Sequence, residues 1–490
     1  MATSPPAPAR QRTWHDLAPL IAFVAVFAKA LRPLEDPDAF WHLATGRLMW
    51  HTHVIPKYDP FSWSGAGRPW VAHEWLTESI LWPLWKVGGD PLLIVLFAAI
   101  VAATFSVVRG TAEQLGAGRF AASGFSFLAA FASAHTFNVR PQMLSLLFTA
   151  VLARPLLTAG HTKRTRLWMV PLMGVWANMH GGFFLGLVLL AVVCGAELFT
   201  WLAGRRSASS APFPRHTLLV TGACVAATLA NPNTVEGLRY PLRYLHEFKP
   251  MMRYIAEWAR PALLSSTYLP FTALLLCTPL LAFAARRRPN FAQFGLLAVV
   301  TALALTAVRN LPVFCVVVTP LAAAWCTAGL TRSQRKGQAP RPSRVRVLPA
   351  SIGAVAMSAT LLGGAGIAAT GVSTSRQIAE HADLYPSATL SSLGQAVDGR
   401  VFNAHDFGGW LIWKGVTVSI DGRSDMYGPE LFLRYIANWS ASPGWQQRLR
   451  EDDVAYVLVE PAAPIAVALR TDTAWRLRAA DPVSVLFERR

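Results

Sequence analysis

Long apolar segments constrain this chain more than any other feature. A helix needs about 20 apolar residues to cross the roughly 30 Å hydrocarbon core of a bilayer, and we predict about eleven such helices along the chain. The predicted spans are 17–34, 88–108, 119–137, 141–159, 167–180, 182–203, 217–230, 261–285, 291–308, 312–330 and 347–370. The sequence therefore predicts a polytopic α-helical membrane protein, with 167–180 and 217–230 short for a full crossing.

Composition excludes the other broad classes of protein. Hydrophobic residues make up 53% of the chain and charged residues only 15%, which is too apolar for a soluble or a disordered protein. The five cysteines lie inside apolar segments, so they indicate no exported disulfide framework. The net charge of +18 comes largely from clusters between apolar segments, and we therefore predict no nucleic-acid partner.

The basic clusters also predict the orientation of the chain. Lys and Arg favour the cytoplasmic ends of spans, and here they occupy every second connection, as at 163–166 and 286–288. This alternation places the N-terminus in the cytoplasm and the C-terminus outside. It divides the chain into a cytoplasmic N-terminal tail (1–16), a transmembrane domain (17–370) and an extracytoplasmic domain (371–490).

The first outer loop, 35–87, is too long to be a simple connection. Near its start, Asp36 can cap a helix whose first residue is Pro37, and this helix is expected to lie along the membrane surface. Two interpretations of the aspartates stay open. Asp36 and Asp38 only stabilise the start of the helix, or they join His42, one turn after Asp38, in an acid/base or metal site.

A second candidate group lies near the end of the same loop. His73 and Glu74 precede an apolar helix, but Thr77 stands where a zinc-protease helix has its second histidine, so a metalloprotease is excluded. Glu74 either pairs with a basic side chain or belongs to the active site. A divalent metal, magnesium or manganese, is a candidate cofactor that the sequence does not require. Its candidate ligands are Asp36, Asp38, His42, His73 and Glu74.

Polar residues also occupy the other outward turns. Arg140 and Arg309 are cations on the side of the membrane where topology does not favour positive charge. A guanidinium binds phosphate bidentately, so either arginine is a candidate to hold a lipid phosphate. The alternative is pairing with Asp36, Asp38 or Glu74. The candidate substrate-binding residues in and around these turns are His42, His73, Arg140, Gln142, Asn178, His180, Arg309 and Asn310.

The composition changes after residue 370, where charged residues become frequent. Short apolar runs that alternate with helical patterns predict a small α/β domain with a mainly parallel sheet. Strands are expected at 400–403, 416–420, 454–459 and 474–479, and helices near 386–397, 428–438, 443–451 and 463–470.

Two motifs of this domain fall at the ends of predicted strands. Open α/β sheets bind ligands at strand ends, which makes Asp406, Asp421 and Arg423 candidate substrate-binding residues. Two alternatives stay open. The glycine pair at 408–409 only permits close helix packing, and Asp421 and Arg423 only pair with each other.

These features resemble a known class of enzymes. Asp36 and Asp38 directly after the first span, the long first outer loop, the many spans and the outward C-terminal α/β domain are similar to the GT-C membrane glycosyltransferases. That class includes protein O-mannosyltransferases, lipid A aminoarabinose transferases and the catalytic subunit of oligosaccharyltransferase. The strings at 36–76 and 421–423 resemble a bacterial multi-pass branch more closely. The string at 405–410 matches the oligosaccharyltransferase acceptor motif only in part, because the paired tryptophans before the aspartate are absent.

The resemblance implies an enzyme of the bacterial plasma (inner) membrane that moves a sugar from a polyprenyl-phosphate carrier to an extracytoplasmic acceptor. It assigns the role of base, or of acceptor-orienting group, to Asp36 or Asp38, and Glu74 is a further catalytic candidate. In this hypothesis Arg140 or Arg309 holds the lipid phosphate, which leaves already ionised. The alternative functions are a non-catalytic envelope scaffold and a lipid or glycan transporter.

Overall fold

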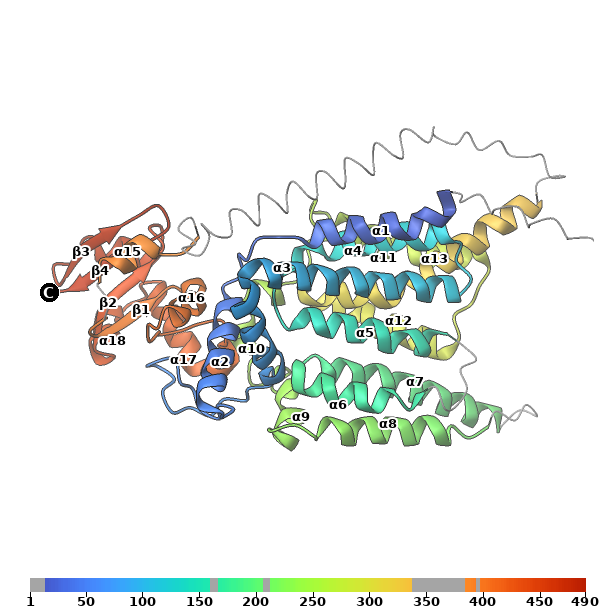
Figure 1. Ribbon diagram of the computed structural model, residues 1–490, viewed down its shortest axis with the longest axis horizontal. Coiled ribbons are helices and arrows are strands. Elements are labelled where there is room, and N and C mark those ends of the chain that lie inside the picture. Colours follow the sequence, from blue (N-terminus) through green and yellow to red (C-terminus); the bar gives the residue numbers. More distant parts are fainter. Residues whose placement is uncertain (1–13, 159–165, 206–211, 337–383, 394–396) are drawn as a thin grey trace, which may run out of the picture.

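The computed structural model describes residues 14–158, 166–205, 212–336, 384–393 and 397–490. A bundle of long helices occupies one end of the molecule and a small α/β domain the other (Figure 1). Helices occur at each predicted span up to residue 330, and the span predicted at 347–370 lies outside the described residues. The bundle helices are α1 (Trp14–Ala30), α3 (Trp75–Gln114), α4 (Arg119–Ser133), α5 (Gln142–Leu157), α6 (Met169–Met179), α7 (Phe183–Gly204), α8 (Arg215–Thr228), α11 (Leu269–Ala285), α12 (Phe291–Thr306) and α13 (Leu311–Lys336).

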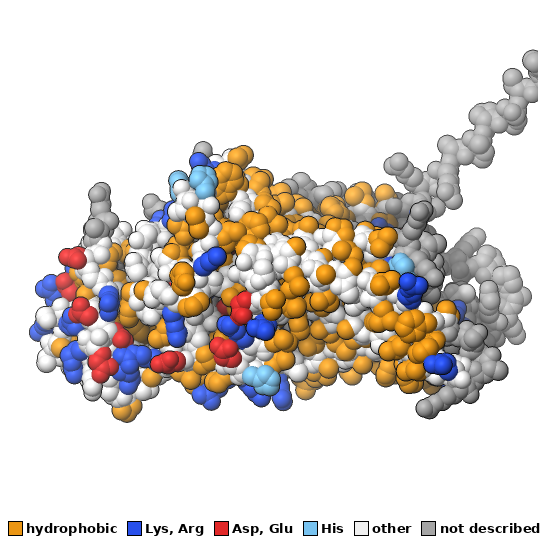
Figure 2. Space-filling view, turned by 90° about the horizontal axis from the view of Figure 1, so that it is seen from below, with side chains coloured by type: hydrophobic (Ala, Val, Ile, Leu, Met, Phe, Trp, Pro, Cys, Tyr) orange, Lys and Arg blue, Asp and Glu red, His pale blue; other side chains and the backbone are white. Residues whose placement is uncertain are grey.

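The bundle has the character of a membrane domain. Leu276, Leu280 and Phe283 lie on one face of α11 and are all exposed, which suits contact with lipid rather than water. Figure 2 shows hydrophobic side chains spread over the bundle, whereas charged side chains gather towards the C-terminal domain. The number of spans and their orientation stay predictions. Among the described residues, the helices long and apolar enough to cross a membrane are Trp75–Gln114, Phe183–Gly204 and Val308–Ser333.

Helix α3 is kinked between the outer loop and the bundle. Gly89 has a φ of 60°, in the left-handed region that favours glycine, and Pro91 lacks the N–H that a continuous helix would use. The part of α3 before the kink carries Glu78 in its first turn and packs against α2. Helix α3 therefore packs against the outer-loop helix α2 before the kink and belongs to the bundle after it.

The C-terminal domain contains a mixed four-stranded sheet of order β1-β2-β4-β3. Only β1 and β2 are parallel, because the chain returns as an antiparallel β3–β4 pair and inserts β4 beside β2. The prediction of a mainly parallel sheet is therefore wrong, and β4 was not predicted. The strands are β1 (Arg400–Asn403), β2 (Val454–Val459), β3 (Trp475–Ala480) and β4 (Val485–Arg489). The helices outside the bundle are α2 (Asp38–Thr52), α9 (Thr234–Arg243), α10 (Lys249–Met252), α15 (Ser387–Ser391), α16 (Gly408–Trp413), α17 (Ser424–Trp439), α18 (Trp445–Glu451) and α19 (Pro464–Leu469).

The strand predicted at 416–420 is not part of this sheet. Val418 instead forms an isolated bridge with Ser62 of the first outer loop, and the Trp63 backbone N–H donates to the Val418 carbonyl at 3.0 Å. Val418 and Ile420 are buried. The apolar run is thus explained by burial against the outer loop, not by a place in the sheet.

The predicted helix at the start of the outer loop is α2. Asp36 Oδ1 accepts the backbone N–H of Asp38 at 3.0 Å, as expected of a residue that caps a helix. The first half of α2 is buried, and the helix packs against α3 and α16. It therefore lies inside the molecule, between the bundle and the C-terminal domain (Figure 1).

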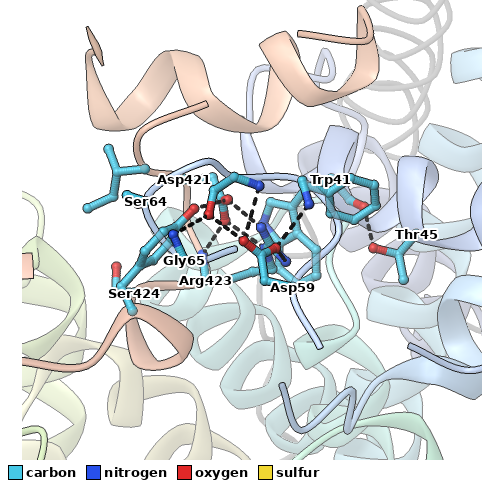
Figure 3. Close-up of polar contacts among 12 residues, drawn as sticks. Trp41, Thr45, Asp59, Ser64, Gly65, Asp421, Arg423 and Ser424 are labelled. Atoms are coloured by element: carbon cyan, nitrogen blue, oxygen red, sulfur yellow. Dashed lines mark hydrogen bonds and ion pairs between the residues drawn. The ribbon is translucent and has the colours of Figure 1, made fainter. Parts of the chain in front are cut away.

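A buried ion-pair network fastens the first outer loop to the C-terminal domain (Figure 3). Arg423 donates from Nε and Nη2 to the two carboxylate oxygens of Asp421, at 2.8 and 2.6 Å, and from Nη1 to Asp59 at 2.8 Å. Tyr427 donates to Asp421 at 2.6 Å, and the guanidinium lies 4.7 Å from the ring centre of Trp70. Asp421 and Arg423 do pair with each other, but Arg423 also pairs with Asp59 and lines a polar cavity.

Breaking this network should destabilise the folded protein. Removing one partner of a buried ion pair leaves an uncompensated charge and costs about 3–5 kcal/mol. We expect Arg423→Met to lower the free energy of unfolding by that amount in detergent-solubilised protein. The matched control is Arg476→Met, because Arg476 pairs with Glu488 at an exposed position, where such pairs contribute about 0–1 kcal/mol. Equal losses in the two variants would contradict the assignment.

Candidate active site

A polar cavity of about 720 Å³ lies where the first outer loop, the outward turns of the bundle and the C-terminal domain meet. It brings together candidate residues that are far apart in the sequence, whereas Asp36, Asn178, Asn310 and Asp421 do not line it. The predicted residues that line it are Asp38, His42, His73, Glu74, Arg140, Gln142, His180, Arg309, Asp406 and Arg423.

Arg140 joins three carboxylates beside this cavity. Its Nη2 lies 3.0 Å from Asp38 Oδ2, its Nη1 lies 2.7 Å from Glu257 Oε1, and its Nε pairs with Asp36. The structure therefore shows the pairing that was the alternative to a phosphate role for Arg140. A guanidinium held by three carboxylates has little positive charge left for a further anion.

Asp36 and Asp38 have different positions at the site. The Asp36 side chain is 5% exposed and does not line the cavity, whereas the Asp38 side chain is 17% exposed and does. Trp41 Nε1 donates to Asp38 Oδ1 at 3.0 Å and fixes its orientation. Burial raises the pKa of Asp38 to about 6, against the opposing effect of Arg140. Above that pH, Asp38 offers an ionised carboxylate to the cavity while Asp36 supports the start of the helix.

Glu74 is surrounded by imidazoles. Its Oε1 lies 3.3 Å from His180 Nε2 and 3.7 Å from His73 Nε2, and its Oε2 lies 3.5 Å from His42 Nδ1. Burial raises the pKa of Glu74 to about 8 and holds that of His42 well below its ordinary value. Near neutral pH, Glu74 therefore holds a proton next to an uncharged His42.

The hydrogen bonds of His180 define its tautomer. Its Nδ1 accepts the backbone N–H of Gly182 at 2.9 Å and lies 2.7 Å from the Ser145 hydroxyl. That hydroxyl accepts Trp176 Nε1–H at 2.6 Å. In the neutral ring the proton must therefore be on Nε2, which faces Glu74.

Among the described residues, one group has the geometry of metal ligands. A ring nitrogen of His42 and carboxylate oxygens of Glu74 and Glu78 lie within 4.8 Å of one another. Glu78 Oε2 is buried without a hydrogen-bond partner, and a cation would satisfy it. One imidazole and two carboxylates fit a divalent ion such as manganese. Of the five predicted ligands, Asp36 and Asp38 are paired with Arg140 instead.

Two predicted site residues have structural roles. The Asn178 amide donates to the carbonyls of Gly174 and Ala230, both at 2.8 Å, and accepts Trp75 Nε1–H at 3.0 Å. Asp421 lies in the ion-pair network that fastens the C-terminal domain. Neither side chain lines the polar cavity, so the geometry of this cavity does not support their assignment as substrate-binding residues. Asn178 satisfies two backbone carbonyls and an indole N–H, and Asp421 satisfies the buried Arg423 and Tyr427.

Some cavity residues were not predicted from the sequence. Glu78 follows Glu74 by one helical turn, and this spacing was the available signal. Asp425 comes two residues after Arg423, beyond the predicted strand 416–420. Tyr244 lies between α9 and α10 and has no local pattern. Each of these side chains lines the polar cavity.

A second cavity, of about 750 Å³, adjoins the first. Apolar side chains of bundle helices provide much of its wall, including Leu146, Phe184, Val188 and Leu303. Asn310 lies here and not in the polar cavity. The residues that line both cavities are His73, Gln142, His180, Tyr244, Glu257, Trp258 and Arg309. A ligand with an apolar chain and a polar head could therefore occupy both cavities at once.

Arg309 lies at this junction and forms no ion pair among the described residues. Its guanidinium lies 4.5 Å from the ring centre of Trp258, and no carboxylate of the described chain forms an ion pair with it. It is partly exposed and lines both cavities. Arg309 is thus better placed than Arg140 to bind an anionic group that enters the junction.

Comparison with solved structures identifies the fold. No family model and no curated protein matches the sequence. Archaeal oligosaccharyltransferase AglB from Archaeoglobus fulgidus, in complex with an inhibitory peptide and a dolichol-phosphate, matches with a TM-score of 0.56 at 11% identity, over 91% of this chain and 69% of that one. ArnT from Cupriavidus metallidurans, bound to undecaprenyl phosphate, matches with a TM-score of 0.51 at 16% identity, over 97% of both chains.

The protein therefore has the fold of the GT-C membrane glycosyltransferases, as the sequence resemblance predicted. The match to ArnT extends over almost the whole length of both chains, so it includes the bundle and the C-terminal domain. At these identities the likeness establishes the fold and not the activity.

The protonation of Glu74 should appear in the pH dependence of stability. The folded protein keeps this proton up to about pH 8, whereas a free glutamate loses it near 4.5. Between these values the native state binds more protons, so stability falls as pH rises. In Glu74→Gln this contribution is absent, and the melting temperature should fall less steeply across that window. The control is Glu430→Gln at an exposed position, which should follow the wild type; an unchanged slope in Glu74→Gln would contradict the prediction.

Proposed function

We propose that this protein is an integral-membrane glycosyltransferase that moves a sugar from a polyprenyl-phosphate carrier to an acceptor on the outer side of a bacterial plasma membrane. The observation that carries the proposal is the pair of joined cavities. The apolar cavity suits an isoprenoid chain, Arg309 at the junction suits its phosphate, and the polar cavity with Asp38 suits the sugar.

The similar structures support the same carrier chemistry. The AglB structure contains a dolichol-phosphate and the ArnT structure contains undecaprenyl phosphate, and both molecules are polyprenyl phosphates. A site for such a lipid needs an apolar channel that ends at a cation. In this chain that description fits the second cavity and Arg309.

The reaction requires one base and one anion-binding group. Asp38 takes the proton from an acceptor hydroxyl while that oxygen attacks the anomeric carbon of the sugar. The new glycosidic bond forms as the bond from the anomeric carbon to the phosphate oxygen breaks. The polyprenyl phosphate leaves as an anion beside Arg309 and needs no proton. In a direct displacement of this kind the configuration of the sugar is inverted.

Arg140, Asp36 and Trp41 position the base. Arg140 Nη2 binds Asp38 Oδ2 and Trp41 Nε1 donates to Asp38 Oδ1, both at 3.0 Å, so both oxygens are oriented before substrate binds. Asp36 and Glu257 balance the charge of Arg140. This balance leaves Asp38 basic enough to accept a proton near neutral pH.

A divalent cation is an additional proposal. His42, Glu74 and Glu78 would hold it, and it would supply positive charge to the donor phosphate. The same residues also have a role without metal, because protonated Glu74 and the neutral imidazoles form a polar wall that carries little net charge. The sugar could then approach Asp38 without competition from a second ionised carboxylate.

Loss of the Asp38 carboxylate should abolish transfer without loss of the fold. A missing general base typically lowers the rate by about 10²–10⁴-fold, and we expect this of Asp38→Asn in a reconstituted assay with a polyprenyl-phosphate sugar. In the wild type, kcat/KM should rise with pH through about 6 as Asp38 ionises. Asp398→Asn, at an exposed position, is the control. Full activity of Asp38→Asn would show that another residue acts as the base, whereas no transfer by the wild type would favour a scaffold or a transporter.

The role of Arg309 can be measured as binding. Loss of a charged hydrogen bond to phosphate costs about 1.5–3 kcal/mol, so Arg309→Ala should bind polyprenyl phosphate at least about tenfold more weakly. Arg260→Ala is the matched control, because Arg260 is exposed in the same region and lines neither cavity. Titration of tryptophan fluorescence in lipid nanodiscs would measure both affinities. Equal affinity in Arg309→Ala and the wild type would place the phosphate elsewhere.

A further inference from the structure

One wall of the polar cavity is aromatic and has no role in the mechanism above. On α17, Phe432, Tyr435 and Trp439 recur every three or four residues, so they lie on one face of the helix, and all three line the cavity. Tyr254, from the segment after α10, lies opposite, with its ring centre 6.4 Å from that of Phe432. Two separate parts of the chain therefore present aromatic rings to the same space.

This aromatic wall lies away from the expected position of the lipid. Phe432, Tyr435, Trp439 and Tyr254 line the polar cavity but not the apolar one. Tyr244 and Trp258, by contrast, line both cavities, at the junction where Arg309 lies. A donor with its chain in the apolar cavity would reach Asp38 from the junction and leave the α17 wall free for a second substrate.

The wall is connected to Asp38 through the C-terminal domain. Tyr435 Oη accepts the backbone N–H of His405 at 2.8 Å, and His405 Nε2 lies 3.1 Å from the Ser424 hydroxyl. Gly422, two residues earlier, packs directly against the carboxylate of Asp38. The surface between the aromatic wall and Asp38 is therefore formed by connected residues of the C-terminal domain. A molecule bound on the wall could extend along it to the proposed base.

The charged groups on this wall favour one kind of ligand. The C-terminal domain contributes Asp406, Asp425 and Glu460 to the cavity, and its one arginine there, Arg423, is engaged by Asp421 and Asp59. Carboxylates accept hydrogen bonds from hydroxyl groups and repel phosphate. Among the described residues, the wall thus combines apolar ring faces with hydrogen-bond acceptors, and its basic side chains, Arg423 and His405, are paired with carboxylates.

We propose that the face formed by Tyr254, Phe432, Tyr435 and Trp439 is the acceptor subsite and that the acceptor is a neutral saccharide. A sugar ring presents an apolar C–H face, which stacks on aromatic rings, and hydroxyl groups at its edge, which donate to carboxylates. An acyl chain would leave Glu460 Oε2, which is buried without a hydrogen-bond partner, unsatisfied, and a phosphorylated acceptor would meet like charge. The proposal rests on the transferase function and specifies its acceptor class.

Glycan binding by the full-length protein in lipid nanodiscs tests the proposal. A glycan array would identify the neutral oligosaccharide that binds best, and saturation-transfer NMR would measure its affinity. Trp439→Ala should bind that glycan about tenfold more weakly, because a stacked ring is lost, while Trp439→Phe should keep most of the affinity. The control is Trp50→Ala, since Trp50 is 51% exposed on α2 and lines neither cavity.

The outcomes separate this proposal from the transferase function. Polyprenyl-phosphate binding is measured on the same samples and should be equal in the wild type and Trp439→Ala. If the wild type binds polyprenyl phosphate but no neutral glycan, or binds only peptides or phosphorylated glycans, the acceptor proposal is overturned and the transferase function stands. Equal glycan affinity in the wild type and Trp439→Ala would also overturn it. Failure of the wild type to bind polyprenyl phosphate would count against the transferase function itself.

Discussion

The buried pairing of Arg423 with Asp421 and Asp59 is the interaction on which the rest of the structure depends. Asp59 belongs to the first outer loop and Arg423 to the C-terminal domain, so the pairing joins two walls of the polar cavity. A buried ion pair stabilises little in comparison with apolar packing, but it strongly disfavours arrangements in which one partner is left alone. It therefore specifies how the domain docks. This docking brings Gly422 against Asp38 and the α17 wall over the site.

The carboxylates at the site are stabilised in two different ways. Arg140 forms ion pairs with Asp36, Asp38 and Glu257, whereas Glu74 is neutralised by its own proton next to uncharged imidazoles. The first keeps Asp38 available as an ionised base. The second removes charge where a sugar would lie. Arg309 forms no ion pair with a described carboxylate, although Glu257 lies near enough to interact with its charge, and this fits a group that binds an anionic ligand.

The sequence predicts the parts of this protein that depend on local pattern. Long apolar segments predict the bundle helices, and Asp36 followed by Pro37 predicts the start of α2. Asp38, His73 and Glu74 are recognised because charge and imidazole stand out in an apolar chain. The contact between Asp59 and Arg423 joins residues 364 positions apart and has no local signal. For the same reason 416–420 resembles a strand, although its apolar side chains are buried against the outer loop instead of in the sheet.

The close approach of Gly422 to Asp38 has a thermodynamic consequence. The surroundings of the carboxylate come partly from the outer loop and partly from the C-terminal domain, so the burial that raises its pKa depends in part on the two parts being together. Any molecule that contacts both parts must strengthen their association, and their association must strengthen its binding by the same factor. Substrate binding and the association of the outer loop with the C-terminal domain are therefore thermodynamically linked equilibria.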